Sequence, residues 1–550
     1  MVARRVIECW RYQLLNKTQM SSELLLAQNN PVLRKQRGVW YTPNAAVDFI
    51  VRAADDIRQQ LFSQYSNVLT VLGNPPYNVS SCNKDQWIET KLADYKTGLS
   101  ERNIQPLSDD YIKFIRLGQD VIERNGSGIL AYITNNGFLD GIIHRQMRHT
   151  LTKAFDTIYI LNLHGSSRRL AAAKARPLTK DENIFDIQQG VSINFFIKHG
   201  TEKNQVFYAE LLGTRQEKLT QLEQLSFDQV PWKPLALQKP YYFFVPKDFS
   251  LQKEYDTGFR VNDLFSVSVS GVKTHHDNDL VAFEPFAEFN ENYCYRGFDM
   301  RYICYDLKRV ERHRYNVMRH LLHGNNTALC ISRQQKSSGF QHVLAVKTIA
   351  DIGLLGDSTT VFPLYRAENN RRQPNLDQTV VTEIEHKLGT TIKASELFDY
   401  IYAVLHHPLY RQRYQEFLKI EFPRIPYPDD VAVFRKLVKI GTALRKLHLF
   451  ENLPKRDVPF PVSGSNIVRK VRFQHNTVWI NGEQYFANVP QSAWTYCIGT
   501  HQVAEKFLKD RKGRVLSLEE IERYGTMIAI LNETVKLAAE CSRIPLCCGS

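Results

Sequence analysis

Four short apolar runs limit the fold of the N-terminal half of this chain more than any other feature. They are Val68–Leu72, GILAYITNN (128–136), TIYILNLHG (157–165) and GVSINFFIK (190–198). Runs of this length and composition are typical of strands buried on both faces of a sheet. Between the first two, residues 108–125 repeat apolar side chains at helical spacing, and Gly126 closes the pattern. Strands alternating with a helix predict an α/β sheet.

A second helix is predicted upstream of the first run. Ala46, Phe49, Ile50 and Ala53 recur at helical spacing, and Asn44 suits the helix N-cap. The first 30 residues are also predicted to be helical. Beyond about residue 200 the chain becomes rich in Tyr, Arg, His and Phe with no clear repeat, until the helical stretch LSLEEIERYGTMIAILNETVKLAAE near the end. The change in composition predicts a domain boundary near 200–235.

The first apolar run ends in the tetrapeptide Asn74-Pro75-Pro76-Tyr77. Prolines fix φ and lack a backbone N–H, so this loop is stiff and presents carbonyls that cannot all pair with neighbouring strands. It also holds an amide and a phenol ring at the carboxyl end of a strand, where open α/β sheets bind their ligands. The alternative interpretation is a purely structural turn.

Length, charge and cysteine content narrow the class of protein. A chain of 550 residues is expected to form two or three domains. Its net charge of +14 is compatible with a polyanionic partner, although a soluble protein that happens to be basic is equally compatible. No apolar run approaches the roughly 18 residues of a membrane helix, and no signal peptide is evident. Nine scattered cysteines without zinc spacing predict reduced thiols, no metal and a cytoplasmic protein.

The NPPY tetrapeptide resembles the catalytic loop of amino-methyltransferases that act on the exocyclic nitrogen of adenine, or less often cytosine, in DNA. The lone pair of an aryl amine is delocalised into the ring, so the nitrogen is a poor nucleophile. The resemblance implies that the Asn74 side-chain oxygen and the Pro75 carbonyl hold its two N–H groups and free the lone pair for methyl transfer. Tyr77 would stack on a base flipped out of the duplex, with Pro76 stiffening the loop.

Other segments resemble further parts of the same family. Tyr41-Thr42-Pro43 resembles the segment that helps to cradle S-adenosylmethionine, the implied cofactor; a helix-start turn is the alternative. Asn135 and Asn136 resemble the next pocket loop, where plain turn formation is an equal alternative. Phe185 is a candidate second stacking partner for the base, and a core aromatic is the alternative.

The resemblance extends through almost all of the remaining chain, to the methylase and specificity portion of single-polypeptide type I (ISP) restriction–modification enzymes. PYYFFVPKDF, SGVKTHHD, YRGFDMRYICY and FLKDRKGRVLSLEEIERY carry it. It implies a target-recognition domain that reads double-stranded DNA, with Arg, Lys, Asn and Gln on base edges and other cations on phosphates. The candidate DNA contacts are Arg168, Arg169, Lys174, Arg176, Lys273, Arg333 and Lys336, with Arg411 and Arg413 as further candidates.

The chain departs from the family pattern upstream of NPPY. Only 30 residues separate Pro43 from Asn74, about the length of one βα unit, where the family has three strands. No DPxxGxG-like loop and no Walker-type GxxxxGK[ST] stretch occurs in the sequence, and no nuclease motif is recognisable. We therefore expect an internal deletion of the glycine-rich cofactor segment and an exposed strand edge.

The predicted fold is α/β: a partial Rossmann-like methyltransferase sheet with its second half retained, then a mixed α+β target-recognition domain with a helical C-terminal part. The predicted boundaries are 1–60 for a helical N-terminal segment with the YTP motif, 61–200 for the partial catalytic domain, 201–235 for a linker and 236–550 for the target-recognition domain.

Three functions remain open from the sequence. The first is an adenine-specific DNA methyltransferase of a restriction–modification system. The second is a catalytically inactive, sequence-specific DNA-binding remnant, unless a separate chain supplies the cofactor-binding, motor or nuclease parts. The third is a protein acting on RNA or on protein amides, since NPPY loops occur there too; the long specificity region argues against it.

Overall fold

The chain forms two compact units, described here from a computed structural model. The N-terminal unit comprises Met1–Lys247 and the C-terminal unit Asp248–Ser550. The structure describes residues 40–65, 68–79, 81–101, 103–166, 181–200, 204–322, 324–335, 339–368 and 371–546. The helix predicted over the first 30 residues lies outside these ranges.

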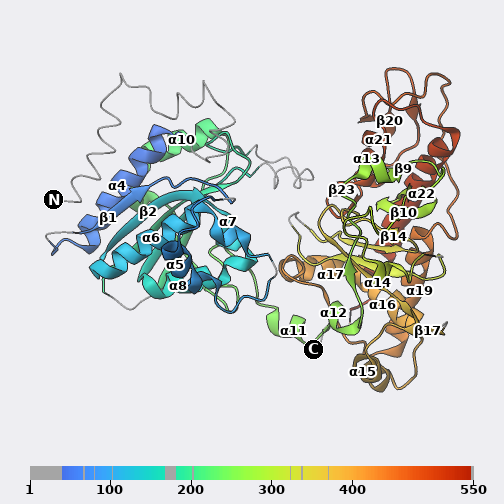
Figure 1. The fold of residues 1–550 in the computed structure, drawn as a ribbon, viewed down its shortest axis with the longest axis horizontal. Coiled ribbons are helices and arrows are strands. Elements are labelled where there is room, and N and C mark those ends of the chain that lie inside the picture. Colours follow the sequence, from blue (N-terminus) through green and yellow to red (C-terminus); the bar gives the residue numbers. More distant parts are fainter. Residues whose placement is uncertain are drawn as a thin grey trace. The chain divides into compact units, whose positions relative to one another are not determined.

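The N-terminal unit is a three-layer α/β structure (Figure 1). Its elements are α4 (Asn44–Leu61), β1 (Thr70–Gly73), α5 (Gln86–Lys96), η1 (Gln105–Ser108), α6 (Asp110–Asn125), β2 (Gly128–Asn135), α7 (Gly137–Asp140), η2 (Ile142–His144), α8 (Arg145–Ala154), β3 (Thr157–His164), β4 (Val191–Lys198), β5 (Gln205–Glu210), α10 (Arg215–Gln224), η3 (Phe227–Gln229) and β6 (Lys233–Pro234). The four predicted strands and the two predicted helices over residues 44–61 and 110–125 are confirmed.

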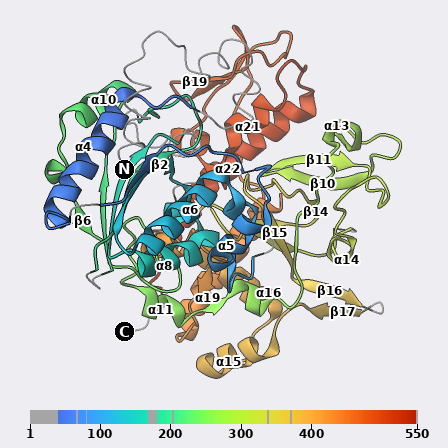
Figure 2. The same ribbon diagram turned by 60° about the vertical axis from the view of Figure 1, so that its left-hand side comes forward.

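One six-stranded sheet, in the order β1-β2-β4-β3-β5-β6, forms the middle layer. β1 is parallel to β2, β3 is parallel to β5, and β4 runs antiparallel between β2 and β3. Because strand side chains alternate between faces, β2 packs Ile129 and Ile133 against α4 and Leu130 against the opposite layer. Figures 1 and 2 show α4 and α10 on one side of the sheet and α5, α6 and α8 on the other.

The stretch 201–235, expected to be a linker, contributes to this unit. Residues 205–210 form β5, which pairs in parallel with β3 from Gln205 to Glu210. Val206 and Tyr208 alternate onto the core beneath α6 and α8. Residues of α10 and η3 cover the other face. The physical reason is the apolar centre of QVFYAE, whose side chains turn to alternate faces of the sheet and are covered on both sides once a neighbouring strand is present.

The C-terminal unit is built from short strands and long helices. Its elements are α11 (Gln252–Asp256), β7 (Phe259–Arg260), α12 (Val261–Leu264), β8 (Val269–Ser270), α13 (Asp277–Leu280), β9 (Val281–Ala282), β10 (Glu291–Arg296), β11 (Asp299–Ile303), α14 (Tyr315–Met318), β12 (Ala328–Ser332), β13 (Val343–Val346), β14 (Ile349–Ala350), β15 (Thr359–Pro363), β16 (Tyr365–Glu368), β17 (Arg371–Pro374), α15 (Gln378–Leu388), α16 (Ala394–His406), α17 (Pro408–Arg413), α18 (Gln415–Leu418), β18 (Arg424–Ile425), α19 (Val431–His448), β19 (Arg472–Gln474), β20 (Thr477–Trp479), β21 (Tyr485–Phe486), α20 (Gln491–Trp494), β22 (Cys497–Ile498), β23 (His501–Gln502), α21 (Val503–Lys509) and α22 (Leu518–Cys541).

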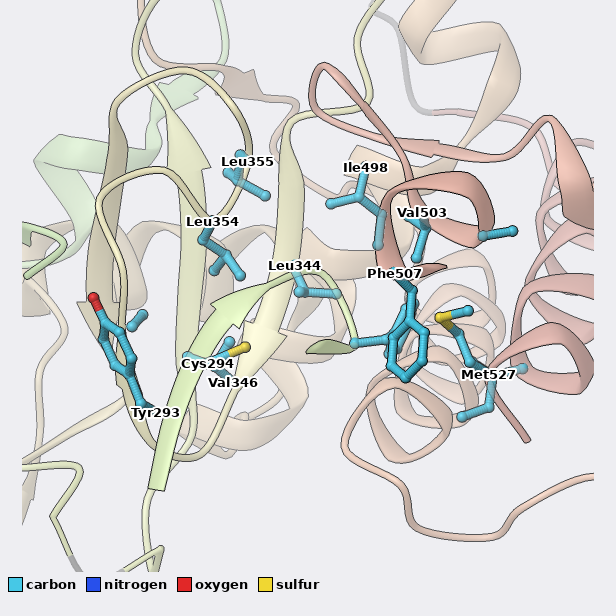
Figure 3. Packing of buried hydrophobic residues seen from close by; sticks show 14 of the residues in the cluster. Tyr293, Cys294, Leu344, Val346, Leu354, Leu355, Ile498, Val503, Phe507 and Met527 are labelled. Carbon is cyan, nitrogen blue, oxygen red and sulfur yellow. The ribbon is translucent and has the colours of Figure 1, made fainter. Parts of the chain in front are cut away.

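A single apolar core joins the strands of this unit to its C-terminal helices. Figure 3 shows Cys294, Leu344 and Val346 from the strands in the same cluster as Phe507 of α21 and Met527 of α22. The predicted helix near the C-terminus is α22, whose N-cap Ser517 and Glu520 form a reciprocal capping box. The mixed α+β composition and helical end of this unit match the expectation.

Candidate active site at the carboxyl edge of the sheet

Strand direction brings the predicted loops to one edge of the N-terminal sheet. β1, β2, β3 and β5 all run the same way, so their carboxyl ends lie on the same side. The NPPY loop follows β1, the Asn135-Asn136 turn follows β2, and Gly165 follows β3. The loop before β4 returns to this edge, because Asn136 N–H donates to the Gly190 carbonyl at 2.9 Å.

Hydrogen bonds fix the Asn74 side chain at both ends of its amide. Its Nδ2 donates to Thr42 Oγ1 at 2.9 Å and, more weakly, to the Trp40 carbonyl at 3.4 Å. Its Oδ1 accepts from the Tyr77 hydroxyl at 3.0 Å. Of these partners, the Trp40 carbonyl can only accept, so it places the amide nitrogen on the side of Trp40 and Thr42. The structure thus brings the YTP segment, predicted for the cofactor side, into direct contact with the predicted catalytic amide.

Three further residues of the two motifs differ in burial and in hydrogen bonding. Pro75 is buried, and its carbonyl accepts no hydrogen bond from any described residue. Tyr41 is 50% exposed, and its hydroxyl donates to Asn44 Oδ1 at 2.9 Å. The Pro43 carbonyl accepts the amides of the first turn of α4. A rigid loop with one unpaired carbonyl beside a fixed amide oxygen provides two neighbouring hydrogen-bond acceptors.

Tyr77 packs against the next helix as well as bonding to Asn74. Its ring meets Tyr111 of α6 edge to face, with centroids 6.2 Å apart, and its hydroxyl also reaches the Ile133 carbonyl at 3.4 Å. Burial, and secondarily the charge of Asp109, raise the pKa of Tyr77 above its usual value, so the hydroxyl stays protonated and can donate.

A chain of hydrogen-bonded polar groups crosses the same edge, from buried Asn162 and Tyr208 to exposed Glu210. Asn136 Nδ2 donates to Asn162 Oδ1 at 3.0 Å, and Asn162 Nδ2 donates to the Tyr208 hydroxyl at 3.1 Å. Tyr208 in turn donates to Glu210 Oε2 at 3.0 Å, which also pairs with His164 Nε2 at 2.8 Å. The hydrogen bond from His164 lowers the pKa of Glu210. The chain fixes the Asn136 amide beside the NPPY side of the sheet.

Gly190 is required for the approach of this loop to Asn136. A Cβ on Gly190 would lie 2.6 Å from Asn136 Nδ2. The loop before it is anchored from α10, where the wholly buried Lys218 pairs with Asp181 Oδ1 at 2.5 Å and donates to the Leu163 carbonyl at 2.7 Å. Only the strand-end asparagines were visible in the sequence; the partners from β3, β5 and α10 carried no motif.

Phe185, the candidate stacking residue, lies in the core. Its side chain is 4% exposed and packs in the cluster around α4 and β4. Its carbonyl accepts from Arg215 Nη2 at 3.0 Å. In this structure the ring is a core contact rather than an open surface for a base, because the loop that carries it is tied down at both its ends.

The candidate DNA contacts are distributed over both units. Arg168, Arg169, Lys174, Arg176 and Lys336 lie outside the described residues. Arg333 is exposed. Lys273 lines an open cavity of ≈ 520 Å³ in the C-terminal unit, together with His275, His276 and Arg296.

The two further candidates make intramolecular contacts. Arg411 donates from Nε to the Leu405 carbonyl at 2.6 Å, and Arg413 forms a bidentate pair with Glu254. Both guanidinium groups therefore already have partners within the C-terminal unit.

No group of His, Cys, Asp and Glu suited to hold a metal ion occurs among the described residues. Within the same part of the chain, none of the helices has both the length and the apolar character needed to span a bilayer.

Two protein-family models match this chain, one in each unit. Residues 58–168 match the model described as Eco57I restriction-modification methylase. Residues 284–540 match the model described as Type ISP C-terminal specificity domain. A search of curated proteins found no match.

Solved structures with a similar fold cover most of this chain. A DrdV–DNA complex aligns with a TM-score of 0.80 and 18% identity, over 94% of this chain and 71% of that one. The ATP-dependent Type ISP restriction-modification enzyme LlaBIII bound to DNA gives 0.73 and 20%, over 88% of this chain and 38% of that one. A nuclease-deletion mutant of the Type ISP enzyme LlaGI with a DNA substrate mimic gives 0.70 and 18%, over 90% and 55%.

The chain therefore spans about two fifths of LlaBIII and about half of LlaGI. At these identities the similarity concerns the fold. Together with the two family models and the edge geometry around Asn74, it identifies the chain as an Eco57I restriction-modification methylase domain followed by a Type ISP C-terminal specificity domain.

Proposed function

We propose that this protein is a site-specific, adenine-specific DNA methyltransferase of a restriction–modification system. It would transfer a methyl group from S-adenosylmethionine to N6 of an adenine flipped out of double-stranded DNA. The observation that carries the proposal is the fixed Asn74 amide at the carboxyl end of β1, within a unit that matches a restriction-modification methylase.

The chain's own residues would act as acceptors for the amino group of the base. Asn74 Oδ1 already accepts one hydrogen bond from Tyr77 at 3.0 Å, and a side-chain amide oxygen has two lone pairs. The Pro75 carbonyl takes no hydrogen bond from the described residues. Two acceptors on the two N–H groups would favour a tetrahedral nitrogen and localise its lone pair. The flipped base would be the ligand of this edge.

The described residues fit the cofactor only in part. Thr42 binds the Asn74 amide directly, which supports a role for Tyr41, Thr42 and Pro43 on the cofactor side. Between Pro43 and Asn74, however, the structure has one helix and one strand, α4 and β1. No glycine-rich loop stands there, and no described strand pairs with the outer edge of β1. We therefore derive no step that depends on the bound cofactor.

This outer edge favours a second candidate, a sequence-specific DNA-binding protein without its own cofactor site. Each residue of β1 is only half-buried, whereas β2 is buried along almost its whole length. An apolar strand at a parallel edge usually has a neighbour. A separate chain that supplies the missing strands would reconcile this edge with methyl transfer.

Titration calorimetry with S-adenosylmethionine separates the two candidates. Micromolar binding by the isolated chain supports the enzyme, whereas absence of binding at millimolar cofactor supports the DNA-binding protein. In both cases the double-stranded DNA affinity should fall steeply with salt while one sequence stays preferred. Equal affinity for random duplexes would reject both.

Asn74→Ala tests the catalytic assignment. Removing one of two acceptors should lower methyl transfer by about 10²–10³-fold, as loss of one preorganised hydrogen-bonding group does in other active sites, and should leave the DNA affinity nearly unchanged. Asn125→Ala is the matched control, since Asn125 ends α6 and only bonds to the Ser127 carbonyl. An Asn74→Ala variant with the wild-type rate would contradict the assignment.

A further inference from the structure

The segment that follows Tyr77 is held by the start of α6. Asp109 Oδ1 accepts the Asn78 backbone N–H at 2.8 Å, and the Asp110 N–H donates back to the Asn78 carbonyl at 3.3 Å. Both backbone groups of Asn78, the residue next to NPPY, are thus bound by two successive residues of another element.

The side chain of Asp109 occupies the N-cap position of α6 without capping it. A helix N-cap Asp normally accepts an amide of its own first turn, but no such side-chain bond is present at α6. The carboxylate is 2% exposed. Burying a carboxylate is unfavourable unless it is hydrogen-bonded. The charge-assisted bond from Asn78 meets this need from outside the helix, in addition to the nearby amides of Asp110 and Tyr111.

Two further residues near the start of α6 contact the loop. Tyr111 meets the Tyr77 ring edge to face, and Tyr77 bonds to Asn74. Lys113, 3% exposed, donates from Nζ to Ser81 Oγ at 3.0 Å and also to the Asn83 carbonyl. Asp109 therefore contacts Asn78, Tyr111 contacts Tyr77, and Lys113 contacts Ser81 and Asn83.

We propose that Asp109 is a positioning residue for the NPPY loop, acting through its ionised carboxylate on Asn78 and so on the orientation of Asn74 and Tyr77. The inference rests on the proposed methyl transfer at Asn74 and deepens it. It adds a pH-dependent control of the same site by a residue that does not touch the substrate.

The surroundings of Asp109 support this role near neutral pH. Burial raises the pKa of Asp109 to about 6, outweighing the backbone amides of Asn78, Tyr111 and Asp110, which lower it. The groups that face it are Tyr77 from the loop and Asp110 and Tyr111 from α6, with Arg148 of α8 beyond Tyr111. Burial keeps the pKa of both tyrosines above the usual value, so Asp109 is the group here that changes charge between pH 5 and 7.

Asp109→Asn tests the inference, because it keeps the shape and removes the charge. Above pH 7 we expect methyl transfer about tenfold below wild type, with unchanged DNA affinity, since a charge-assisted bond becomes a neutral one. Below pH 6 the wild-type rate should fall to that of the variant, whose own profile should lack this limb. Asp85→Asn is the control: Asp85 caps its own helix α5, is exposed, and accepts from Trp87 N–H at 2.8 Å.

Amide hydrogen exchange gives a readout that does not need activity. In the wild type, protection of the peptide covering residues 74–83, corrected for intrinsic rates, should fall about tenfold from pH 7 to pH 5. Local release of Asn78 leaves Asp109 buried and removes an amide that lowers its pKa, so acid favours the released state, in contrast to complete unfolding, which exposes Asp109 to water. Constant protection over this range overturns the inference, and so does an Asp109→Asn variant that keeps both the wild-type rate and the wild-type pH profile. A wild-type chain without methyl transfer instead overturns the proposed function, and with it the catalytic meaning of this contact.

Discussion

Both units contain ion pairs between distant segments, but they differ in where other polar groups converge. In the N-terminal unit a set of polar side chains also meets at one edge of one sheet, where Asn74, Asn136 and Glu210 all follow or end parallel strands. In the C-terminal unit polar side chains form ion pairs that join distant segments. Arg511 of the segment after α21 reaches Asp299 of β11 at 2.8 Å and Glu520 of α22 at 2.8 Å, while Arg445 of α19 pairs with Asp399 of α16 at 2.6 Å.

This difference follows from the strands available to each unit. Long parallel strands align many loops at one edge, so polar groups can converge there. The C-terminal unit has strands of two to six residues in several small sheets. Such sheets bury little by themselves, and side-chain pairs between elements provide the connections. We expect substitutions at the sheet edge to change chemistry and substitutions in the ion pairs to change stability.

The largest effect is expected from Arg511→Met in the C-terminal unit. Arg511 is 1% exposed, and its loss removes one buried partner from Asp299, which keeps Arg301, and one from Glu520, which keeps only the longer contact with Arg514 as an ion pair. Breaking a buried pair from one side costs about 3–5 kcal/mol of unfolding free energy. Calorimetry of the full chain should show the C-terminal transition shifted and the N-terminal one unchanged.

The control for this change is Arg435→Met. Arg435 pairs with Glu396 while 44% exposed, so its removal should cost at most about 1 kcal/mol. Equal destabilisation by the two variants would remove the contrast between buried and surface pairs.

Acid should destabilise the C-terminal unit more than the N-terminal one. Burial lowers the pKa of His448 to about 3 and that of His406 well below its usual value. In the unfolded chain both histidines have a pKa of about 6.5, so below this pH the unfolded state binds more protons than the folded state. Stability is therefore present above pH 6.5 and lost as the pH falls, by about 1.4 kcal/mol per pH unit for each imidazole. Urea unfolding between pH 7.5 and 5 measures this slope.

The N-terminal unit combines two opposite trends over the same range. The pKa of His144 is lowered to about 3, again by burial, whereas that of Asp109 is raised to about 6. A raised carboxyl pKa gains stability as the pH falls from 6 toward 4, which offsets the imidazole. An N-terminal transition with the steeper loss of stability in acid would reverse the comparison.

Tyr77→Phe should have a moderate effect on chemistry. It removes the hydroxyl that donates to Asn74 Oδ1 but keeps the ring against Tyr111. We expect about a tenfold lower methyl-transfer rate, the equivalent of one hydrogen bond, and unchanged DNA affinity. The control is Tyr159→Phe, since Tyr159 stacks on Phe207 of β5. A Tyr77→Phe variant as active as the control would show that the hydroxyl does not orient Asn74.

Lys273→Met should have the smallest effect. Lys273 lines the ≈ 520 Å³ cavity of the C-terminal unit. If it binds one phosphate, DNA affinity should fall a few-fold and the slope of log K against log salt should decrease by about 0.9, with sequence preference unchanged. Lys436→Met on the exposed side of α19 is the control. A changed sequence preference would assign Lys273 to base reading instead.

The sequence predicted the N-terminal sheet better than its boundaries. The runs that became β2, β3 and β4 were visible because central strands bury both faces and so are continuously apolar. Residues 205–210 were missed because the apolar run within QVFYAE is short, and only pairing with β3 makes it part of the sheet. In the C-terminal unit, strands as short as two residues give no detectable period, whereas the long helix α22 does.

For the candidate site, the sequence predicted the residues of the two motifs but not the contacts that surround them. Asn74, the tyrosine after it and the YTP segment could be selected because their residue types suit the chemistry. Asp109 stands at the N-cap of α6, a position that suits Ser108 or Asp109 by residue type, and only the structure shows that its carboxylate accepts from Asn78. Phe185 was a stacking candidate, and the structure buries it.

By itself, the sequence determined which segments become buried strands and which loop carries the amide and phenol, because apolar runs and prolines act locally along the chain. The tertiary structure alone decided which distant partners those groups meet: Thr42 on the Asn74 amide, and Asp109 on Asn78. Hydrogen bonds need donors and acceptors within about 3 Å, and between residues some thirty positions apart that distance is set by strand register and helix packing.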